Sequence, residues 1–516
     1  MFNMKQVFIA VVMCFALSTI AQTKKEVYNL FSEGNYEGAL EELLELYELE
    51  QDNDEYAYLI GVCYLNTNID KSMAVNYLEQ AASSSKPNEN AVYLLGRAYH
   101  FAYRFDDAIK SYQKFKETAK STNLNLITVD KQIEYCENAK EFFKFPANVS
   151  FENLGKNVNS AYPDYYPFIP SNESYLIFNS QRDEQSSPMG NGQYMANIYL
   201  APVKEGEFAP AKLINFNINT VEENEEVVGL NSAGDKAIIY KEDFQKGSAL
   251  YECAVTEKRL ESEMILPKTI NSKYTEIAAS LSSDGTKMYF ASDRPGGYGG
   301  VDIYMCQRLP NGQWSQALNL GPTINTEEDE DFPNISPDGM TLFFSSKGHT
   351  SMGGYDIFKA SWNSVKRRFV SVRNIGYPIN TPEDNMNFRV SASGRYGYIS
   401  ALRKGGLGDL DIYRVTFNEV EPEYTIVTGN IISSEENGTF DNAFISVIDE
   451  ETGEVYGDYI PNLQTMRFVM ILPPGKYEIL VESDGYEELL ENVEVLDKSS
   501  YRSFIEKNFK LTTIQD

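Results

Sequence analysis

The sequence predicts a multidomain protein in which an N-terminal α-solenoid is followed by a β-propeller and a C-terminal β-sandwich. Three observations predict this order. The first third has a helical period, the middle repeats a unit of about 50 to 60 residues, and the last part alternates apolar and polar residues. The chain has 516 residues, more than one domain normally holds.

Residues 1–21 are expected to be a secretory signal peptide. Lys5 precedes an apolar run at residues 7–20, which is too short to span a membrane comfortably. Small side chains at Thr19 and Ala21 fit a cleavage site, so the mature chain would begin at residue 22. No other stretch is long and apolar enough for a transmembrane helix.

Charge and composition narrow the classes of function. The formal net charge of −30 argues against nucleic-acid binding, which needs basic patches. Only two histidines, His100 and His349, are present, so we expect no His-rich zinc site and no Ser-His-Asp triad. The cysteines outside the signal form no CxxC pair, so we expect buried free thiols. They are Cys63, Cys136, Cys253 and Cys306.

Residues 22–145 are predicted to form helical hairpins. Stretches 56–81 and 91–115 align, and the matched glycines of the two stretches are 35 residues apart. The matched small residues, expected where two helices touch, are Gly61 with Gly96 and Ala74 with Ala108. The segment resembles a tetratricopeptide array, and such arrays present a concave surface to another protein. A helical spacer that binds nothing is the alternative.

Residues 146–420 contain five units, each with about four short strands. An Asn-Ser or Asn-Thr pair opens each unit, at intervals of 60, 52, 54 and 55 residues. The asparagines are Asn159, Asn219, Asn271, Asn325 and Asn380. Repeats of this kind predict a five-bladed propeller, with a sixth, poorly repeated blade as the alternative. The fifth unit lacks a final strand, and VSFENLGKNVN at 149–159 has the form of the missing one, so we expect it to complete the last blade.

A glycine-rich stretch, SDRPGGYGGVDIY at residues 292–304, recurs at 345–358 and 400–413. Its spacing fits neither a phosphate-binding loop nor a dinucleotide fingerprint, so we expect a hairpin between two strands. Asp302, Asp356 and Asp411 begin the strands after these hairpins. Arginines also recur at the hairpins, where they either line one face of the propeller or pair with carboxylates of their own blade. They are Arg182, Arg294 and Arg403.

The repeats at residues 149–417 resemble the PD40 repeats of TolB-type, WD40-like propellers. PD40 propellers also occur in prolyl oligopeptidases, but no GxSxG motif is present, so we do not expect an enzyme and assign no catalytic residue, cofactor or metal ligand. The acidic run TEEDEDF at 326–332 lacks the spacing of an EF-hand and is expected to be a solvated loop.

Residues 421–516 alternate apolar and polar side chains between short turns, which predicts a small β-sandwich. The stretch LPPGKYEILVESDGYE at 472–487 resembles the carboxypeptidase-regulatory-like domain, which acts as a spacer without catalysis of its own.

The order of domains resembles OmpA-family periplasmic proteins associated with the type IX secretion apparatus. The OmpA-like domain that ends those proteins has no counterpart here, so we do not expect direct binding to peptidoglycan. The resemblance implies a non-enzymatic periplasmic scaffold near the outer membrane, with envelope proteins as partners. The alternative is a solute-binding protein that holds a glycan or peptide in the propeller mouth.

Overall fold

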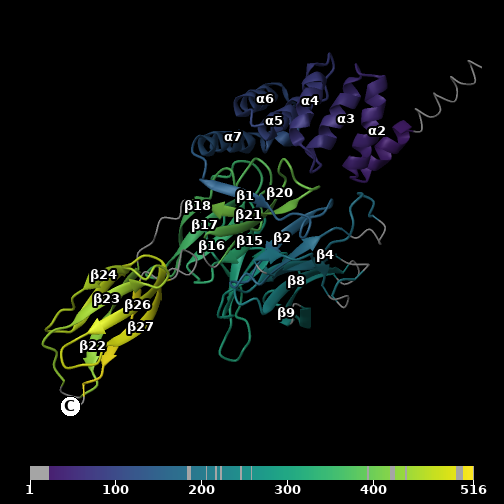
Figure 1. Ribbon diagram of the computed structural model, residues 1–516. Coiled ribbons are helices and arrows are strands. Elements are labelled where there is room, and N and C mark those ends of the chain that lie inside the picture. The colour runs from purple at the N-terminus through teal and green to yellow at the C-terminus, as the bar shows by residue number, and fades with distance from the viewer. Residues whose placement is uncertain are drawn as a thin grey trace, which may run out of the picture.

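The computed structural model comprises a helical region, a propeller-like ring of antiparallel sheets and a β-sandwich (Figure 1). It describes residues 23–182, 188–204, 206–214, 218–220, 224–243, 247–256, 259–391, 394–418, 425–435, 438–495 and 504–514. The signal peptide expected at residues 1–21 lies outside these ranges. None of the described helices is both long and apolar enough to cross a membrane.

The helical region is a succession of antiparallel helices. After a helix at residues 23–32, it contains α2 (Tyr36–Leu49), α3 (Asp54–Leu65), α4 (Ala74–Ser83), α5 (Ala91–Phe101), α6 (Phe105–Thr118) and α7 (Val129–Lys144), with 3₁₀ turns η1 (Lys71–Met73) and η2 (Leu124–Leu126). Asn53 caps α3 by accepting hydrogen bonds from the amides of Glu55 and Tyr56.

Small residues lie where the helices of a pair touch. A Cβ atom on Gly61 would stand 2.4 Å from Cγ of Leu78, and one on Gly96 would stand 2.7 Å from Cε1 of Tyr112. Ala74 and Ala108 are fully buried. These positions therefore set how closely α3 approaches α4 and α5 approaches α6.

Five antiparallel sheets occupy residues 149–417. Their strands are β2 (Asp164–Phe168), β3 (Tyr175–Ser180), β4 (Asn197–Lys204), β5 (Glu207–Phe208) and β6 (Lys212–Leu213); β7 (Asn224–Leu230), β8 (Lys236–Asp243), β9 (Gly247–Thr256) and β10 (Arg259–Ile265); β11 (Ala279–Leu281), β12 (Lys287–Ser292), β13 (Asp302–Gln307) and β14 (Leu318–Asn319); β15 (Glu330–Ile335), β16 (Thr341–Ser346), β17 (Asp356–Asn363) and β18 (Arg368–Asn374); and β19 (Arg389–Val390), β20 (Tyr396–Ala401), β21 (Asp411–Phe417) and β1 (Val149–Asn153).

The sheets close into a ring. The second, third and fourth sheets each pack against the preceding or following sheet through their first strands, and β2 of the first sheet packs against β20 and β21 of the last. The fourth and fifth sheets share an apolar cluster that contains Phe343 and Phe388. Strand β1 pairs with β21 from Val149 opposite Phe417 to Asn153 opposite Tyr413. A strand that precedes the first sheet in sequence therefore completes the last sheet, as the sequence predicts, and this leaves no open end between them.

The repeated asparagines join consecutive sheets. Asn325 accepts a hydrogen bond from the amide of Ile303 and donates one to the carbonyl of the same residue, at 2.8 and 3.0 Å. Asn159 does the same with Ile412, so it links the first sheet to the last. The other partners are Ile198 for Asn219, Leu250 for Asn271 and Ile357 for Asn380.

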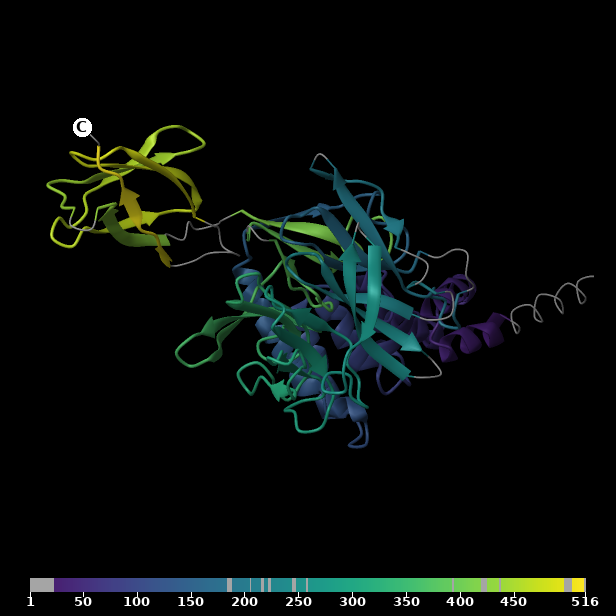
Figure 2. The ribbon, with the colours of Figure 1, turned by 90° about the horizontal axis from the view of Figure 1, so that it is seen from below.

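The C-terminal unit is a two-sheet sandwich that lies to one side of the ring in both views (Figures 1 and 2). Its core contains Phe468, Tyr477 and Phe509. Its strands are β22 (Thr425–Ser433), β25 (Arg467–Leu472), β28 (Phe504–Glu506) and β29 (Phe509–Leu511) in one sheet, and β23 (Phe444–Asp449), β24 (Val455–Tyr459), β26 (Gly475–Glu482) and β27 (Leu489–Val495) in the other.

The expectation of a solvated acidic loop at residues 326–332 is wrong for two of its acids. Glu330 and Asp331 are buried at the start of β15. Glu330 is held there by hydrogen bonds from the amide and hydroxyl of Thr326 and from the hydroxyl of Ser346. These three donors compensate the carboxylate for its loss of water.

Candidate functional site

The glycine-rich hairpins are folded onto the loops that precede the first strands of the sheets. Asp302 accepts hydrogen bonds from the amides of Tyr298 and Gly299 and so fixes the hairpin between β12 and β13. A Cβ atom on Gly299 would stand 1.9 Å from the carbonyl oxygen of Glu328, which leaves room only for glycine. In the other two hairpins, Asp356 accepts a hydrogen bond from the amide of Met352, and Asp411 accepts one from the amide of Leu407.

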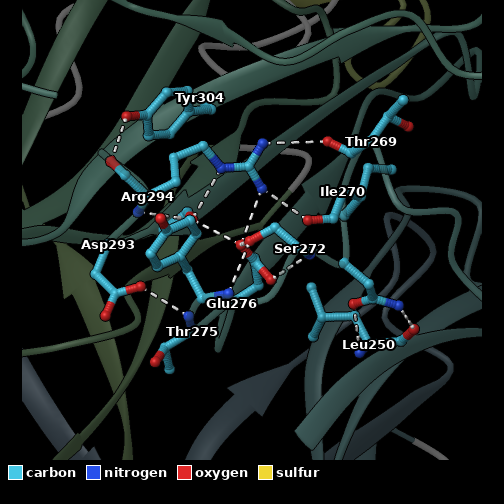
Figure 3. A network of polar contacts seen from close by, with 12 residues as sticks. Leu250, Thr269, Ile270, Ser272, Thr275, Glu276, Asp293, Arg294 and Tyr304 are labelled. Carbon is cyan, nitrogen blue, oxygen red and sulfur yellow. Dashed lines mark hydrogen bonds and ion pairs between the residues drawn. The ribbon is translucent and has the colours of Figure 1, made fainter. Parts of the chain in front are cut away.

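The three repeated arginines bind within the ring, and Figure 3 shows the network around Arg294. Its Nη2 donates to Glu276 Oε1 at 2.9 Å and to the carbonyl of Ile270 at 2.7 Å. Arg182 forms an ion pair with buried Asp164. Arg403 donates to the carbonyl of Pro378 at 2.6 Å and lies over the ring of Phe151.

Sequence reasoning missed a repeated set of acceptors, two of which, Asp164 and Glu276, bind Arg182 and Arg294. They stand five or six residues after the repeated asparagines, and each accepts from the Ser or Thr that follows its asparagine. They are Asp164, Glu225, Glu276, Glu330 and Asn385. The fifth is an amide, so Arg403 has no carboxylate at the equivalent place. In four of the five units the sequence contains the signal, an Asp or Glu at a nearly constant interval after the repeated asparagine.

The helical region covers the face of the ring that carries the glycine-rich hairpins, which we call the hairpin face (Figure 1). Met352, in the hairpin between β16 and β17, is fully buried in the core of α5–α7. His100 of α5 is hydrogen-bonded through Nε2 to the carbonyl of Met352 at 2.9 Å. Tyr135 of α7 donates to the carbonyl of Lys347 at 2.6 Å.

Two further contacts cross the boundary nearer the N-terminus. Lys71 Nζ lies 2.6 Å from Glu383 Oε2, and Asn68 donates to Asp409 at 2.7 Å. Burial raises the pKa of both carboxyl groups, Glu383 and Asp409, while their hydrogen bonds oppose that change. These contacts join the segment between α3 and α4 to the loops that precede β19 and β21 of the fifth sheet.

Between these contacts lies a cleft of three cavities, which we call the interdomain cleft. A cavity of about 450 Å³ is lined by α5 and α7 residues such as Arg97 and Gln132, and by Asp384 of the ring. A second, of about 340 Å³, lies against Glu37 and Gln193. A third, of about 260 Å³, has Gln193, Asp384 and the start of β2 in its wall. Shared lining residues connect the three.

The third cavity lies at the end of the ring nearest the helices, because the first strands β2 and β7 and residues of the fifth sheet line it together with Asn68. Tyr165 and Tyr166 of β2 stand beside Glu226 of β7, and the Tyr165 hydroxyl donates to Glu226 Oε1 at 2.6 Å. Burial raises the pKa of Glu226, and the hydrogen bond from Tyr165 counteracts it. Acidic and aromatic groups therefore surround this mouth.

The histidines and cysteines are engaged in packing. His349 Nε2 is hydrogen-bonded to the carbonyl of Ile324 at 2.9 Å, and burial lowers the pKa of His100 to about 4. All four described cysteines are buried free thiols, as expected, and burial raises the pKa of Cys306 to about 11. Within the described ranges, no group of three or more His, Cys, Asp or Glu side chains is placed to hold a metal ion.

Comparisons with known proteins give only distant structural similarity. No family model and no curated protein matches the chain. TolB from Acinetobacter baumannii aligns with a TM-score of 0.31 and 15% identity over 50% of this chain and 56% of that chain, little more than half of TolB's length.

Two other solved structures have similar scores. The periplasmic gluconolactonase PpgL from Pseudomonas aeruginosa aligns with a TM-score of 0.27 and 10% identity, over 64% of this chain and 86% of that chain. The RRP9 WD40 repeats align with a TM-score of 0.29 and 10% identity, over 53% of this chain and 99% of that chain. At these scores, none of the three proteins is evidence about what this chain binds.

Proposed function

We propose that this protein is a non-enzymatic scaffold that binds a segment of a protein partner in the interdomain cleft. The observation that carries the proposal is the cleft itself, which is built jointly by the helical region and the hairpin face and is bridged by hydrogen bonds on both sides. Its cavities of about 450 and 340 Å³ fit a few side chains of an inserted loop or tail.

We also propose a specific type for each of the three parts of the fold. The five sheets are five propeller blades closed by β1, the helices are tetratricopeptide-like repeats, and the sandwich is a carboxypeptidase-regulatory-like spacer. In this arrangement the ring covers part of the inner side of the helical array. A partner therefore enters between the two parts instead of lying along a free concave surface.

The cleft favours a partner segment with basic or polar side chains. Glu37, Glu383, Asp384 and Asp409 line its two larger cavities, against Lys71 and Arg97. Burial is the main cause that raises the pKa of Glu37, Glu383 and Asp409. A basic side chain that entered would restore the charged form of such carboxyl groups.

The location that we propose is the periplasm, near the outer membrane, with envelope proteins of a type IX secretion apparatus as the partners. The signal-like N-terminus and the order of domains support this placement. Direct binding to peptidoglycan, to nucleic acid or to a cofactor is not part of the proposal.

Two matched turns provide the test. Asn191-Gly192-Gln193 lines the cleft, and Asn311-Gly312-Gln313 of the third sheet has the same hydrogen bonds and belongs to none of the described cleft cavities. The Gln193→Trp variant should fill the cleft, while Gln313→Trp adds the same side chain elsewhere.

The measurement is crosslinking followed by affinity purification from intact cells. We expect the unaltered protein and Gln313→Trp to recover the same envelope proteins, and Gln193→Trp and a version lacking residues 22–145 to lose them. Recovery of no envelope protein by the unaltered chain would refute the scaffold function. Equal recovery by both tryptophan variants would show that the partner binds outside the cleft.

A second candidate function is the binding of a small glycan or peptide at the mouth of the ring. The 260 Å³ cavity with Tyr165, Tyr166 and Glu226 favours it, because aromatic faces and carboxylates are common in such sites. Melting temperatures measured against a panel of glycans and short peptides test this candidate, and a ligand-specific rise in the unaltered protein that Gln193→Trp abolishes would support it.

A further inference from the structure

A buried arginine inside the ring has no counter-ion among the residues that the structure describes. Arg389 of β19 is 5% exposed. Its Nε, Nη1 and Nη2 atoms have no hydrogen-bond partner among the residues that the structure describes. Burial lowers the pKa of Arg389 to about 9, and no described carboxylate lies close enough to counteract this change. The guanidinium lies over the ring of Phe168 in β2, 4.1 Å from its centroid, so stacking fixes its plane.

Arg389 is the exception at a position that every sheet repeats. In each sheet, a residue of the first strand pairs with the third residue of the second strand. The first-strand residues at this position are Phe168, Gly229, Ser280, Asn334 and Arg389. Four of the five are neutral, so neither the ring closure nor the packing of a sheet requires a cation here.

Arg389 is among the residues that line a small cavity at the end of the ring opposite the helices, and its guanidinium nitrogens are buried beside that cavity. The first strands begin on the hairpin face, where Tyr165 borders the interdomain cleft, and end at tight turns on the other side, which we call the turn face. The cavity is lined by strand ends and turns of four sheets, among them Phe168, Leu230 and Ile335. Arg389 is the one charged residue among its described lining residues.

We propose that this cavity is a carboxylate-binding site with Arg389 as its anchor. An uncompensated buried charge costs several kcal/mol, and an anion that entered would remove that cost. The planar fork of a guanidinium matches the two oxygens of a carboxylate. The cavity of about 30 Å³ has room for these two oxygens but not for a sugar ring or a whole peptide.

The carboxylate comes from a free small acid or from an acidic side chain or C-terminus of a partner segment that reaches the turn face. This site is on the opposite side of the ring from the interdomain cleft, so it does not depend on the proposed scaffold function. Its failure in the test below would leave the cleft proposal unchanged.

Binding of ¹³C-labelled acetate to the full chain tests the proposal by line broadening in NMR spectra at fixed ionic strength. The variants are Arg389→Met, which removes the charge, and Arg389→Lys, which keeps the charge but loses the fork. Arg368→Met is the matched control, because Arg368 is exposed on β18. We expect saturable broadening with the unaltered protein and with Arg368→Met, at least tenfold weaker binding by Arg389→Lys, and none by Arg389→Met.

The source of the carboxylate is distinguished by calorimetry with the peptide acetyl-Asp-Glu-Asp-amide and its uncharged analogue acetyl-Asn-Gln-Asn-amide. Peptide binding at least tenfold tighter than acetate binding indicates a partner segment, and equal or weaker binding indicates a free acid. The proposal is overturned if neither acetate nor the acidic peptide binds, or if Arg389→Met binds them as the unaltered chain does.

A folding check keeps these results interpretable. Both tryptophans, Trp314 and Trp362, lie in the ring, so their fluorescence follows its unfolding. Because Arg389→Met removes an unpaired buried charge, we expect its melting temperature without ligand to equal or exceed that of the unaltered protein. A clear fall would contradict the unpaired state of Arg389, and Arg389→Lys would then report on binding.

Discussion

At the scale of single residues, the ring depends on polar groups that are buried together with their partners. The ion pair of Arg294 and Glu276 ties the hairpin after β12 to the loop before β11 (Figure 3). Glu276 is almost fully buried, and it accepts four hydrogen bonds, from Ser272, Ser292 and Arg294. A carboxylate in this position is stable only while its donors remain.

Arg294→Met should therefore destabilise the ring by about 3–5 kcal/mol, because it leaves a buried carboxylate without its cation. Denaturant unfolding followed by tryptophan fluorescence measures this loss. The exposed control Arg368→Met should change stability by less than about 0.5 kcal/mol. Equal losses of stability in the two variants would show that the buried ion pair contributes no more to stability than an exposed arginine does.

Asp331 makes the stability of the ring depend on pH. Burial raises its pKa to about 7, so the folded protein binds more protons than the unfolded chain between about pH 4 and pH 7. Stability contributed by this group is present at the acidic end of that window and is lost as pH rises through it. A shift of about three pKa units corresponds to an effect on the order of 4 kcal/mol.

Asp331→Asn should remove this dependence, because an amide stays neutral while its oxygen still accepts from the amide of Phe332. We expect the variant to match the unaltered ring at pH 5 and to exceed it at pH 8 in unfolding experiments. Glu207→Gln, an exposed carboxyl of the first sheet, is the control and should follow the unaltered curve. If the stability of Asp331→Asn changed with pH in the same way as that of the unaltered protein, the pH dependence could not be assigned to Asp331.

Individual residues also show the limits of sequence reasoning. The asparagines and glycines could be found because they recur with one identity at nearly constant spacing. The acceptors after the asparagines were missed because Asp, Glu and Asn alternate there, with one shift of register. Arg389 was missed for the opposite reason. It breaks the repeat, and only the structure shows that its surroundings are buried and neutral.

At the scale of elements, strand β1 decides whether the ring is closed. It is the outer strand of the last sheet, paired with β21 along five residue pairs. A chain that starts at residue 148 should unfold in one cooperative transition by tryptophan fluorescence. A chain that starts at residue 154 should lose that cooperativity or melt at least about 5 °C lower, since β21 would become an unpaired edge. Identical melting of the two chains would contradict closure by β1.

Helix contacts are equally specific. Gly96→Ala places a methyl group against the ring of Tyr112, which is fully buried, so we expect a loss of about 1–3 kcal/mol in the helical region. Thermal unfolding followed by circular dichroism measures it. Adding Tyr112→Leu to Gly96→Ala should make the combined loss smaller than the sum of the two single losses, because the obstacle is removed. Additive losses would show that the two residues do not interact.

Most of these elements were predictable, because periodicity and turn residues act locally. The helices follow from the period of small and aromatic residues, and the strands follow from the turns and the apolar runs between them. The acidic run at 326–332 was assigned wrongly because its charge suggested solvent, whereas its place in the repeat put Glu330 beside Thr326 and Ser346.

At the scale of the whole molecule, the arrangement of the helical region on the hairpin face was not predictable. It rests on contacts between residues that are 200 to 350 positions apart in the chain, such as His100 with Met352 and Asn68 with Asp409. The sequence predicted a concave helical surface that faces a partner by itself. The structure instead holds the helical region against loops of the ring, and the interdomain cleft lies between the two parts.

The central claim is that a partner enters the interdomain cleft, and site-specific photocrosslinking in intact cells tests it most directly. A benzophenone side chain is placed at position 193 in the cleft or at position 313 in the matched turn of the ring. We predict a discrete crosslinked envelope protein from position 193 and none from position 313. The same product from both positions, or no product from position 193 while the protein is folded and exported, would contradict the account.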